Sequence, residues 1–252
     1  MKKTVLVTGA TSGFGKAIAT RFAKEGDDLI ITGRRDDLLT ELGEKLREEY
    51  KIEVLSLCFD VRMKDEVELA IDSLPDEWKE IDILVNNAGL AVGLNPIQEG
   101  VIDDWERMID TNVKGLLYMT RYVSPLMVDR KKGHIINIGS IAGKEVYPNG
   151  NVYCGSKFAV DAITKGMRID LLPHNIKVTQ VAPGAANTEF SLVRFKGDQP
   201  RADAVYNGFT PLNAEDVAEV VWYVTTLPSH VNINDLVVMP TAQASSMHFY
   251  KT

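Results

Sequence analysis

The chain has 252 residues, 45% of them apolar, and carries a formal net charge of −7. This length and apolar content are sufficient for one large α/β domain or two small ones. The acidic charge argues against a nucleic-acid or anionic-membrane partner, and no apolar run is long enough to span a bilayer. Cys58 and Cys154, the only cysteines, predict neither a disulfide framework nor a metal site. The two cysteines, together with an N-terminus that lacks a signal-peptide pattern, favour a reducing, cytoplasmic location.

The N-terminal segment predicts a strand, a glycine-rich turn and a helix. Thr4 to Thr8 form a β-branched run, and Ala17 to Ala23 show helical periodicity. In this context glycines let the backbone approach a dinucleotide pyrophosphate, and the helix N-terminus supplies N–H donors. The spacing Gly-x-x-x-Gly-x-Gly would also suit a plain loop. The candidate cofactor contacts in the turn are Gly9, Thr11, Ser12, Gly13, Phe14 and Gly15.

An arginine pair follows the second predicted strand, Asp28 to Thr32. At this distance from a glycine turn, an acidic residue would bind the ribose of NAD, whereas arginine would accept the 2′-phosphate of NADP. Arg34 and Arg35 therefore indicate NADP. The alternative is a solvated pair at a helix start, although cations are disfavoured at that end of a helix.

The next elements alternate in the same way. We expect helices over 36–50 and 64–74 and strands over 53–59 and 81–85. Asp60, followed by Val61, could bind an adenine amine or cap the next helix. After the strand 81–85, the segment Asn86 to Gly89 suits either a ligand crevice or an ordinary turn. Its candidate cofactor contacts are Asn87, Ala88 and Gly89.

A long helical pattern over 103–127 contains Asn112, and a strand over 134–138 ends beside Ser140. A further helix carries Tyr153 and Lys157, four residues apart and so on one face. An ammonium one turn away favours the phenolate and lowers the pKa of the tyrosine, which suits general acid–base chemistry. Alone, this spacing would also describe an ordinary amphipathic helix.

The last part of the chain predicts a strand over 176–181, a helix over 214–227 and a strand over 235–239. Pro183, Gly184 and Thr188 follow the first of these strands. The irregular segment 189–210 is typical of a mobile loop that closes over a site and includes a short helix. The polar tail 241–252 is predicted to be loosely ordered or used in assembly.

Alternating strands and helices predict a single α/β, Rossmann-type, doubly wound parallel sheet with helices on both faces. The carboxyl ends of parallel strands gather on one side of the sheet. The polar and glycine clusters at the ends of the first six strands should therefore converge. We expect one domain, 1–252, with a substrate loop over about 185–212.

The sequence resembles the short-chain dehydrogenase/reductase family over nearly its whole length. The matching motifs are Thr8-Gly9-x-x-x-Gly13-x-Gly15, Asn86-Asn87-Ala88-Gly89, Asn112, Ser140, Tyr153-x-x-x-Lys157 and Pro183-Gly184-x-x-x-Thr188. The resemblance implies an NAD(P)-dependent oxidoreductase, usually a homotetramer or dimer. It implies that Tyr153 is the acid/base and that Lys157 binds the nicotinamide ribose and lowers the tyrosine pKa. It also implies that Ser140 binds the substrate oxygen and that Asn112 supports a water-linked proton relay.

Within the family, the segment from Thr188 to Asp198 resembles that of NADP-dependent 3-hydroxy acid dehydrogenases, which act on serine, L-allo-threonine or malonic semialdehyde. The chain differs from some members at Ala185-Ala186-Asn187, in the loop expected to contact nicotinamide and substrate. This resemblance implies hydride transfer between NADP(H) and a hydroxy acid or oxo acid, and a homotetramer. Arg194 lies in the loop, and its guanidinium could bind the substrate carboxylate or be solvated.

Two rival functions are compatible with these residues. The first is reduction of a neutral ketone or diketone on the same fold. The second is a non-catalytic NADP-binding regulator, against which the set Asn112, Ser140, Tyr153 and Lys157 argues.

Overall fold

Seven parallel strands form one sheet in the order β3-β2-β1-β4-β5-β6-β7 in the computed structural model, which describes residues 2–252. This arrangement confirms the predicted doubly wound parallel sheet. The order in which strands are added reverses at β1, which pairs with both β2 and β4. The strands are β1 (Thr4–Thr8), β2 (Asp28–Gly33), β3 (Val54–Cys58), β4 (Ile83–Asn86), β5 (Gly133–Ile138), β6 (Ile176–Pro183) and β7 (Asp235–Val238).

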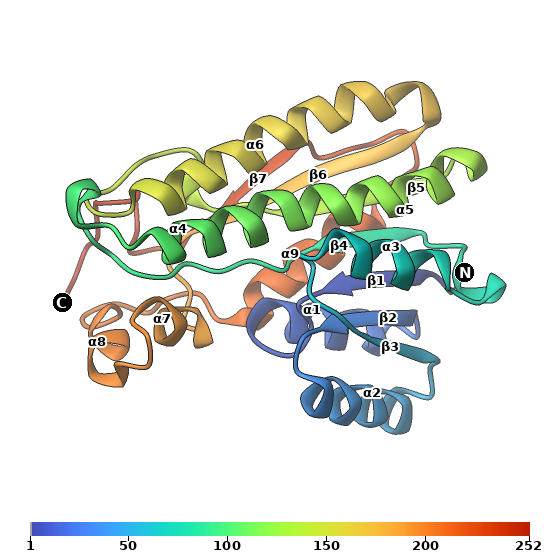
Figure 1. Cartoon of the computed structure of the whole chain (residues 1–252), viewed down its shortest axis with the longest axis horizontal. Coiled ribbons are helices and arrows are strands. Elements are labelled where there is room, and N and C mark those ends of the chain that lie inside the picture. Colours follow the sequence, from blue (N-terminus) through green and yellow to red (C-terminus); the bar gives the residue numbers. More distant parts are fainter. Residues whose placement is uncertain (1) are drawn as a thin grey trace.

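Helices cover both faces of the sheet (Figure 1). Because strand side chains alternate, Val5 and Val7 pack toward α1, α2 and α9, whereas Leu6 packs toward α3, α5 and α6. Among the described residues, no helix is long and apolar enough to cross a membrane. The helices are α1 (Gly13–Lys24), α2 (Asp36–Tyr50), α3 (Lys64–Asp72), α4 (Ile102–Ile109), α5 (Leu116–Arg130), α6 (Asn151–Leu171), α7 (Glu189–Arg194), α8 (Gln199–Ala204) and α9 (Ala214–Thr226).

The helix expected over 103–127 is not regular throughout. A π-helical segment, Asp110–Gly115, separates α4 from α5 and contains Asn112. π-Helical turns of this kind often occur at functional sites, where they redirect a side chain. The sequence pattern missed the segment because apolar residues continue with helical spacing on both sides of it.

The segment after β6 and the C-terminal tail are more ordered than the sequence predicts. The segment 189–210 contains two short helices, α7 and α8, which lie beyond the end of the sheet beside the C-terminus (Figure 1). In the tail, Gln243 is buried and its side-chain oxygen accepts a hydrogen bond from the Ala185 N–H at 2.7 Å. The Thr252 N–H also bonds to the Gly208 carbonyl at 2.9 Å. Long-range hydrogen bonds thus order the tail, which was predicted to be loosely ordered or used in assembly, and its use in assembly stays a prediction.

A buried polar network fixes the ends of β4 and β5. The Asn86 amide donates to Asn137 Oδ1 at 2.9 Å and to Thr120 Oγ1 at 3.0 Å. The Asn137 amide in turn donates to Thr164 Oγ1 at 2.9 Å. These bonds join two adjacent strands to α5 and α6 immediately before the segments that enter the candidate site. Buried networks of this kind impose a unique arrangement because every unmade bond is costly.

Asn137→Ala should destabilise the protein by roughly 2–4 kcal/mol, because Asn86 and Thr164 would each lose a buried hydrogen-bond partner. Urea unfolding followed by circular dichroism would measure the loss. The control is Asn207→Ala, which removes an exposed amide. Equal unfolding midpoints for the two variants would show that the network does not stabilise the sheet.

Candidate active site

The glycine-rich turn between β1 and α1 forms one wall of a cavity of about 320 Å³. Gly9 and Gly13 have φ angles of +67° and +50°, which side-chain-bearing residues rarely adopt. A Cβ at Gly15 would collide with the Gly9 carbonyl oxygen, so this glycine permits the turn to pack closely. Ser12 precedes α1 without a side-chain capping bond, which leaves first-turn N–H groups for a ligand. The turn therefore fits a dinucleotide pyrophosphate.

The two arginines after β2 line the same cavity. Arg35 donates to Thr11 Oγ1 at 2.9 Å and lies 3.5 Å from a Glu189 carboxylate oxygen. Arg34 lies 3.6 Å from Asp60 Oδ2. The side chains of Arg34 and Arg35 are 53% and 47% exposed, so both guanidinium groups can still receive a phosphate. Their position fits the 2′-phosphate of NADP.

Asp60 does not cap the next helix, which excludes one of the two roles open from the sequence. Met63 is the N-cap residue of α3, and no side chain caps that helix. Asp60 instead accepts hydrogen bonds from Arg62, with Nη2 to Oδ2 at 2.6 Å. Burial acts to raise the pKa of Asp60, but the hydrogen bonds from Arg62 and the charge of Arg34 outweigh it and hold that pKa below its usual value. Asp60 is thus an ionised wall residue of the cavity.

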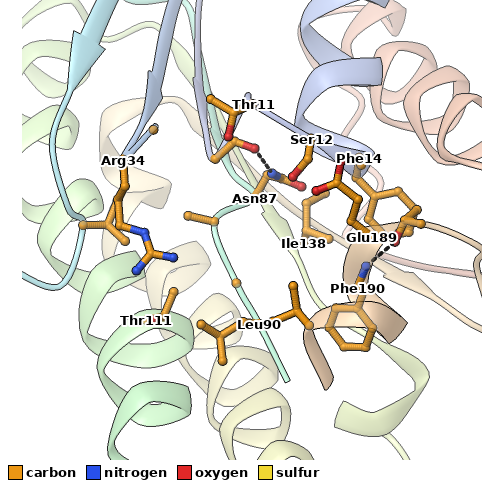
Figure 2. A pocket seen from close by; sticks show the side chains of 18 of the residues that line it. Thr11, Ser12, Phe14, Arg34, Asn87, Leu90, Thr111, Ile138, Glu189 and Phe190 are labelled. Atoms are coloured by element: carbon orange, nitrogen blue, oxygen red, sulfur yellow. Dashed lines mark hydrogen bonds between the residues drawn. The ribbon is translucent and has the colours of Figure 1, made fainter. Parts of the chain in front are cut away.

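Most of the remaining predicted cofactor residues converge on this cavity. Figure 2 shows Arg34 at the left of the cavity, Thr11 above it, and Ser12 together with Glu189 and Phe190 from α7 on the side opposite Arg34. The Asn87 amide donates to the Thr8 carbonyl at 2.8 Å, which fixes the segment after β4 against the glycine turn. The other predicted residues in the wall are Phe14, Val61, Ala88, Gly89, Tyr153, Lys157 and Thr188.

Tyr153 and Lys157 lie together at the inner end of the cavity, but their electrostatics differ from the sequence prediction. Lys157 Nζ donates to the Ile138 carbonyl at 2.9 Å and lies 6.0 Å from the centre of the tyrosine ring. Burial lowers the pKa of Lys157 to about 8. Burial also raises the pKa of Tyr153, whereas the nearby Arg194 charge and Ser140 hydroxyl act to lower it. The net direction is therefore opposite to the lowered tyrosine pKa that the spacing predicts.

Asn112 connects the π-helical segment to Leu90, in the loop after β4, and to Ser156 on α6. Its side-chain oxygen accepts from the Leu90 N–H, and its amide donates to the Leu90 carbonyl, both at 2.8 Å. The amide also donates to Ser156 Oγ at 3.0 Å, in the turn of α6 between Tyr153 and Lys157. Asn112 forms no hydrogen bond with the side chain of Tyr153 or Lys157. Its contacts hold the loop after β4 against α6.

A second cavity of about 430 Å³ meets the first at Tyr153. Ser140, Pro183, Gly184 and Arg194 line it. The Arg194 guanidinium carbon lies 5.0 Å from the centre of the Tyr153 ring. Its Nη2 donates to the Tyr147 hydroxyl at 2.7 Å, whereas its buried Nε has no hydrogen-bond partner among the described residues. The structure therefore places a cation with an unused donor beside the candidate acid/base.

Several residues of the second cavity were not singled out from the sequence. Tyr147 binds Arg194, and the Phe190 ring packs against Tyr153 with 5.6 Å between ring centres. Met247 and Phe249 from the tail also line the cavity. These contacts join segments distant in the chain, so no local spacing could have indicated them.

Among the described residues, no three or more histidine, cysteine, aspartate or glutamate side chains are grouped so that they could hold a metal ion.

Comparisons with known proteins identify the family. The family model described as short chain dehydrogenase matches residues 3–198. The chain belongs to this family. The NADP-dependent 3-hydroxy acid dehydrogenase YdfG of Escherichia coli (strain K12) is 51% identical to it over 241 residues, which are 95% of this chain and 96% of the relative.

Two further relatives cover almost the whole of this short-chain dehydrogenase. Sulfoacetaldehyde reductase 2 of Chromohalobacter salexigens is 50% identical over 247 residues, which are 98% of this chain and 97% of the relative. The closed form of serine dehydrogenase complexed with NADP+ is a solved structure that is 49% identical, with a TM-score of 0.92. That comparison covers 99% of this chain and 100% of the other.

Tyr153→Phe should retain NADP binding but lose turnover by about 10²–10⁴-fold, because it keeps the ring and removes only the acid/base hydroxyl. Initial rates and a cofactor fluorescence titration would measure the two effects. Tyr223→Phe, at a side chain that is 50% exposed on α9, is the matched control. Turnover of Tyr153→Phe within a few-fold of the control would exclude Tyr153 as the acid/base.

Replacing Arg34 and Arg35 together by glutamine should raise the KM for NADP far more than the KM for NAD, because only NADP carries the 2′-phosphate. Initial rates with each cofactor would measure both constants. The control is Lys45→Gln, which removes an exposed cation from α2. Equal weakening of the two cofactors would indicate a structural role for the arginine pair.

Proposed function

We propose that this short-chain dehydrogenase transfers hydride reversibly between NADP(H) and a short 3-hydroxy acid or the corresponding 3-oxo acid. L-Serine, L-allo-threonine and 3-hydroxypropionate are the candidate hydroxy acids. The observation that carries this proposal is the position of Arg194, whose guanidinium carbon lies 5.0 Å from the Tyr153 ring in the cavity that Ser140 also lines. The relatives named as a 3-hydroxy acid dehydrogenase and a serine dehydrogenase support it.

The residues that would hold the cofactor are those of the first cavity. The glycine turn and the α1 N-terminus would bind the pyrophosphate, and Arg34 and Arg35 the 2′-phosphate. Asp60 and Val61 would lie beside the adenine, and Lys157 beside the nicotinamide ribose. When bound, the nicotinamide exchanges a hydride with the carbon that bears the substrate oxygen. The NADP dependence of the relatives supports this assignment.

Tyr153 would exchange the proton with the substrate oxygen, and Ser140 would hold that oxygen by a hydrogen bond. Burial raises the pKa of Tyr153 and so favours the neutral phenol, which is the form that donates a proton to a carbonyl during reduction. In oxidation Tyr153 would first have to lose its own proton, and the phenolate oxygen would then accept the hydroxyl proton. Asn112 would support the proton relay by holding the loop after β4 against α6.

Arg194 and Tyr147 would together recognise the acid group. Because the tyrosine hydroxyl accepts a hydrogen bond from Arg194, its own proton remains available to the anion. Burial raises the pKa of Tyr147, so this hydroxyl stays protonated and can donate. A carboxylate could thus receive donors from both side chains. A sulfonate has the same charge, and the relative named sulfoacetaldehyde reductase 2 favours it as a second substrate class.

We also propose a cytoplasmic homotetramer in which residues 1–252 act as one domain with a substrate loop over about 185–212. Both cysteines are free thiols, as in a reducing compartment. Apolar side chains on α5 and α6 are partly exposed, with Leu117, Phe158 and Ile169 at 41%, 41% and 73%, and could be covered by other subunits.

Arg194→Ala should cost about 2–4 kcal/mol in kcat/KM for acids, because it removes the partner of a buried charge. Initial rates with NADP and NAD would compare L-serine, L-allo-threonine, 3-hydroxypropionate, 2-hydroxyethanesulfonate and a neutral alcohol. NADP affinity and rates on the neutral alcohol should stay nearly unchanged.

The control for this panel is Arg201→Ala, which removes an exposed arginine of α8 that stacks on the Phe195 ring at 4.5 Å but does not itself line the cavity. An equal loss on acids and on the neutral alcohol would point to general disruption of the loop and would reject acid recognition by Arg194. A wild-type preference for neutral substrates would favour the ketone reductase, and no turnover of any substrate would favour the regulator.

A further inference from the structure

An ion pair joins the substrate loop to α4. Lys196 Nζ lies 2.7 Å from Asp104 Oδ2. Lys196 is the second residue after α7, whereas Asp104 lies in the first turn of α4. The pair therefore connects two segments that are far apart in the sequence.

Asp104 is unusual because its side chain is only 7% exposed, whereas that of Lys196 is 54% exposed. Among the described residues, Lys196 is the one cation that forms an ion pair with it. A carboxylate in such a place is unfavourable unless a partner compensates for its lost hydration. The buried Asp104 carboxylate is therefore stabilised when the loop is closed and Lys196 lies close enough to form the ion pair.

A second contact holds the same short segment. The Gly93 N–H donates to the Arg194 carbonyl at 3.0 Å. Lys196 itself has a φ of +55°, in the left-handed region that a lysine seldom occupies. This turn is maintained while the Lys196 N–H bonds to the Val193 carbonyl at 3.1 Å and its side chain reaches Asp104. Arg194 is thus fixed at its own carbonyl and again two residues later.

We propose that Asp104 and Lys196 are a positioning pair that holds Arg194 beside Tyr153 and so sets the preference for acid substrates. The inference rests on the proposed function of Arg194. Neither Asp104 nor Lys196 lines the cavity that contains Ser140, so neither would touch the substrate. Their effect would pass through the placement of the Arg194 guanidinium, which would bind acids poorly once the loop moved away.

A positioning role and a merely structural role predict different kinetics. Loss of a structural ion pair would lower stability and affect all substrates alike. Loss of a positioning pair would raise KM for acids, leave kcat within about two-fold, and spare both NADP affinity and the neutral alcohol. The two side chains would also act as a unit, so removing both would cost no more than removing one.

The test compares Asp104→Asn, Lys196→Gln and the double variant in the full-length enzyme. KM for 3-hydroxypropionate should rise roughly five- to thirty-fold in each, an interaction of the size found between contacting residues. Because Asp104 is buried and its variant could fail to fold, Lys196→Gln alone keeps the test decisive. Asp76→Asn is the matched control, since it removes an exposed ion pair of the same 2.7 Å length from Lys79.

Hydrogen exchange of the NADP-bound enzyme supplies a readout that does not depend on substrate. The amides of Gly93, Lys196 and Gly197 should exchange faster in the variants and not in the control. Unchanged exchange, or an equal kinetic loss on acid and neutral substrates, would overturn the positioning pair. If Lys196→Gln leaves acid preference intact while Arg194→Ala abolishes it, only the positioning role of Asp104 and Lys196 is rejected. If neither variant alters acid preference, the proposed role of Arg194 fails as well.

Discussion

The arrangement of the site depends on one constraint, which is that a half-buried guanidinium must have partners. Arg194 satisfies part of this need with the Tyr147 hydroxyl and stacks near the Tyr153 and Phe190 rings, each 5.0 Å from its central carbon. The protein leaves its Nε without a hydrogen bond among the described residues. An anionic substrate would complete the set, because it supplies both acceptors and the opposite charge.

The same cation links substrate recognition to acid–base chemistry. Burial raises the pKa of Tyr153, and Arg194 is the first of the groups that oppose this effect. An acid that neutralised Arg194 would weaken that opposition and favour the neutral phenol further. The protonated tyrosine needed for reduction would then be stabilised most when the substrate is in place. Under the proposed function, the loop after β6 would therefore contribute to the proton transfer as well as to substrate binding.

Much of the site could be predicted because the parallel sheet determines which segments gather at the carboxyl ends of its strands. Once the chain is seen as a parallel sheet, the glycine turn, Arg34, Asn87 and Ser140 must gather at the carboxyl ends of the strands, and they do. Arg194 lines the same cavity as Ser140, and its contact with a substrate stays a prediction. The convergence of the strand ends could be predicted because backbone topology, not the detail of side-chain packing, brings these segments together.

Other features depend on contacts that no local pattern encodes. The spacing of Tyr153 and Lys157 predicted a lowered tyrosine pKa, whereas burial of the phenol in the folded protein raises it. The π-helical segment around Asn112 was hidden within a continuous apolar periodicity. The ordered tail depends on Gln243, a buried polar side chain whose partner lies 58 residues earlier. Each of these differences arises from tertiary burial or hydrogen bonding that overrides a local preference.

Under the proposed function, Arg194 selects substrates by their negative charge. The most direct measurement compares kcat/KM of the wild-type enzyme for 3-hydroxypropionate and for its methyl ester, which keeps the reacting alcohol and removes the charge. We predict that the acid is preferred by about 30-fold or more, the ratio that corresponds to a buried charge contact. Equal values for acid and ester would contradict the account.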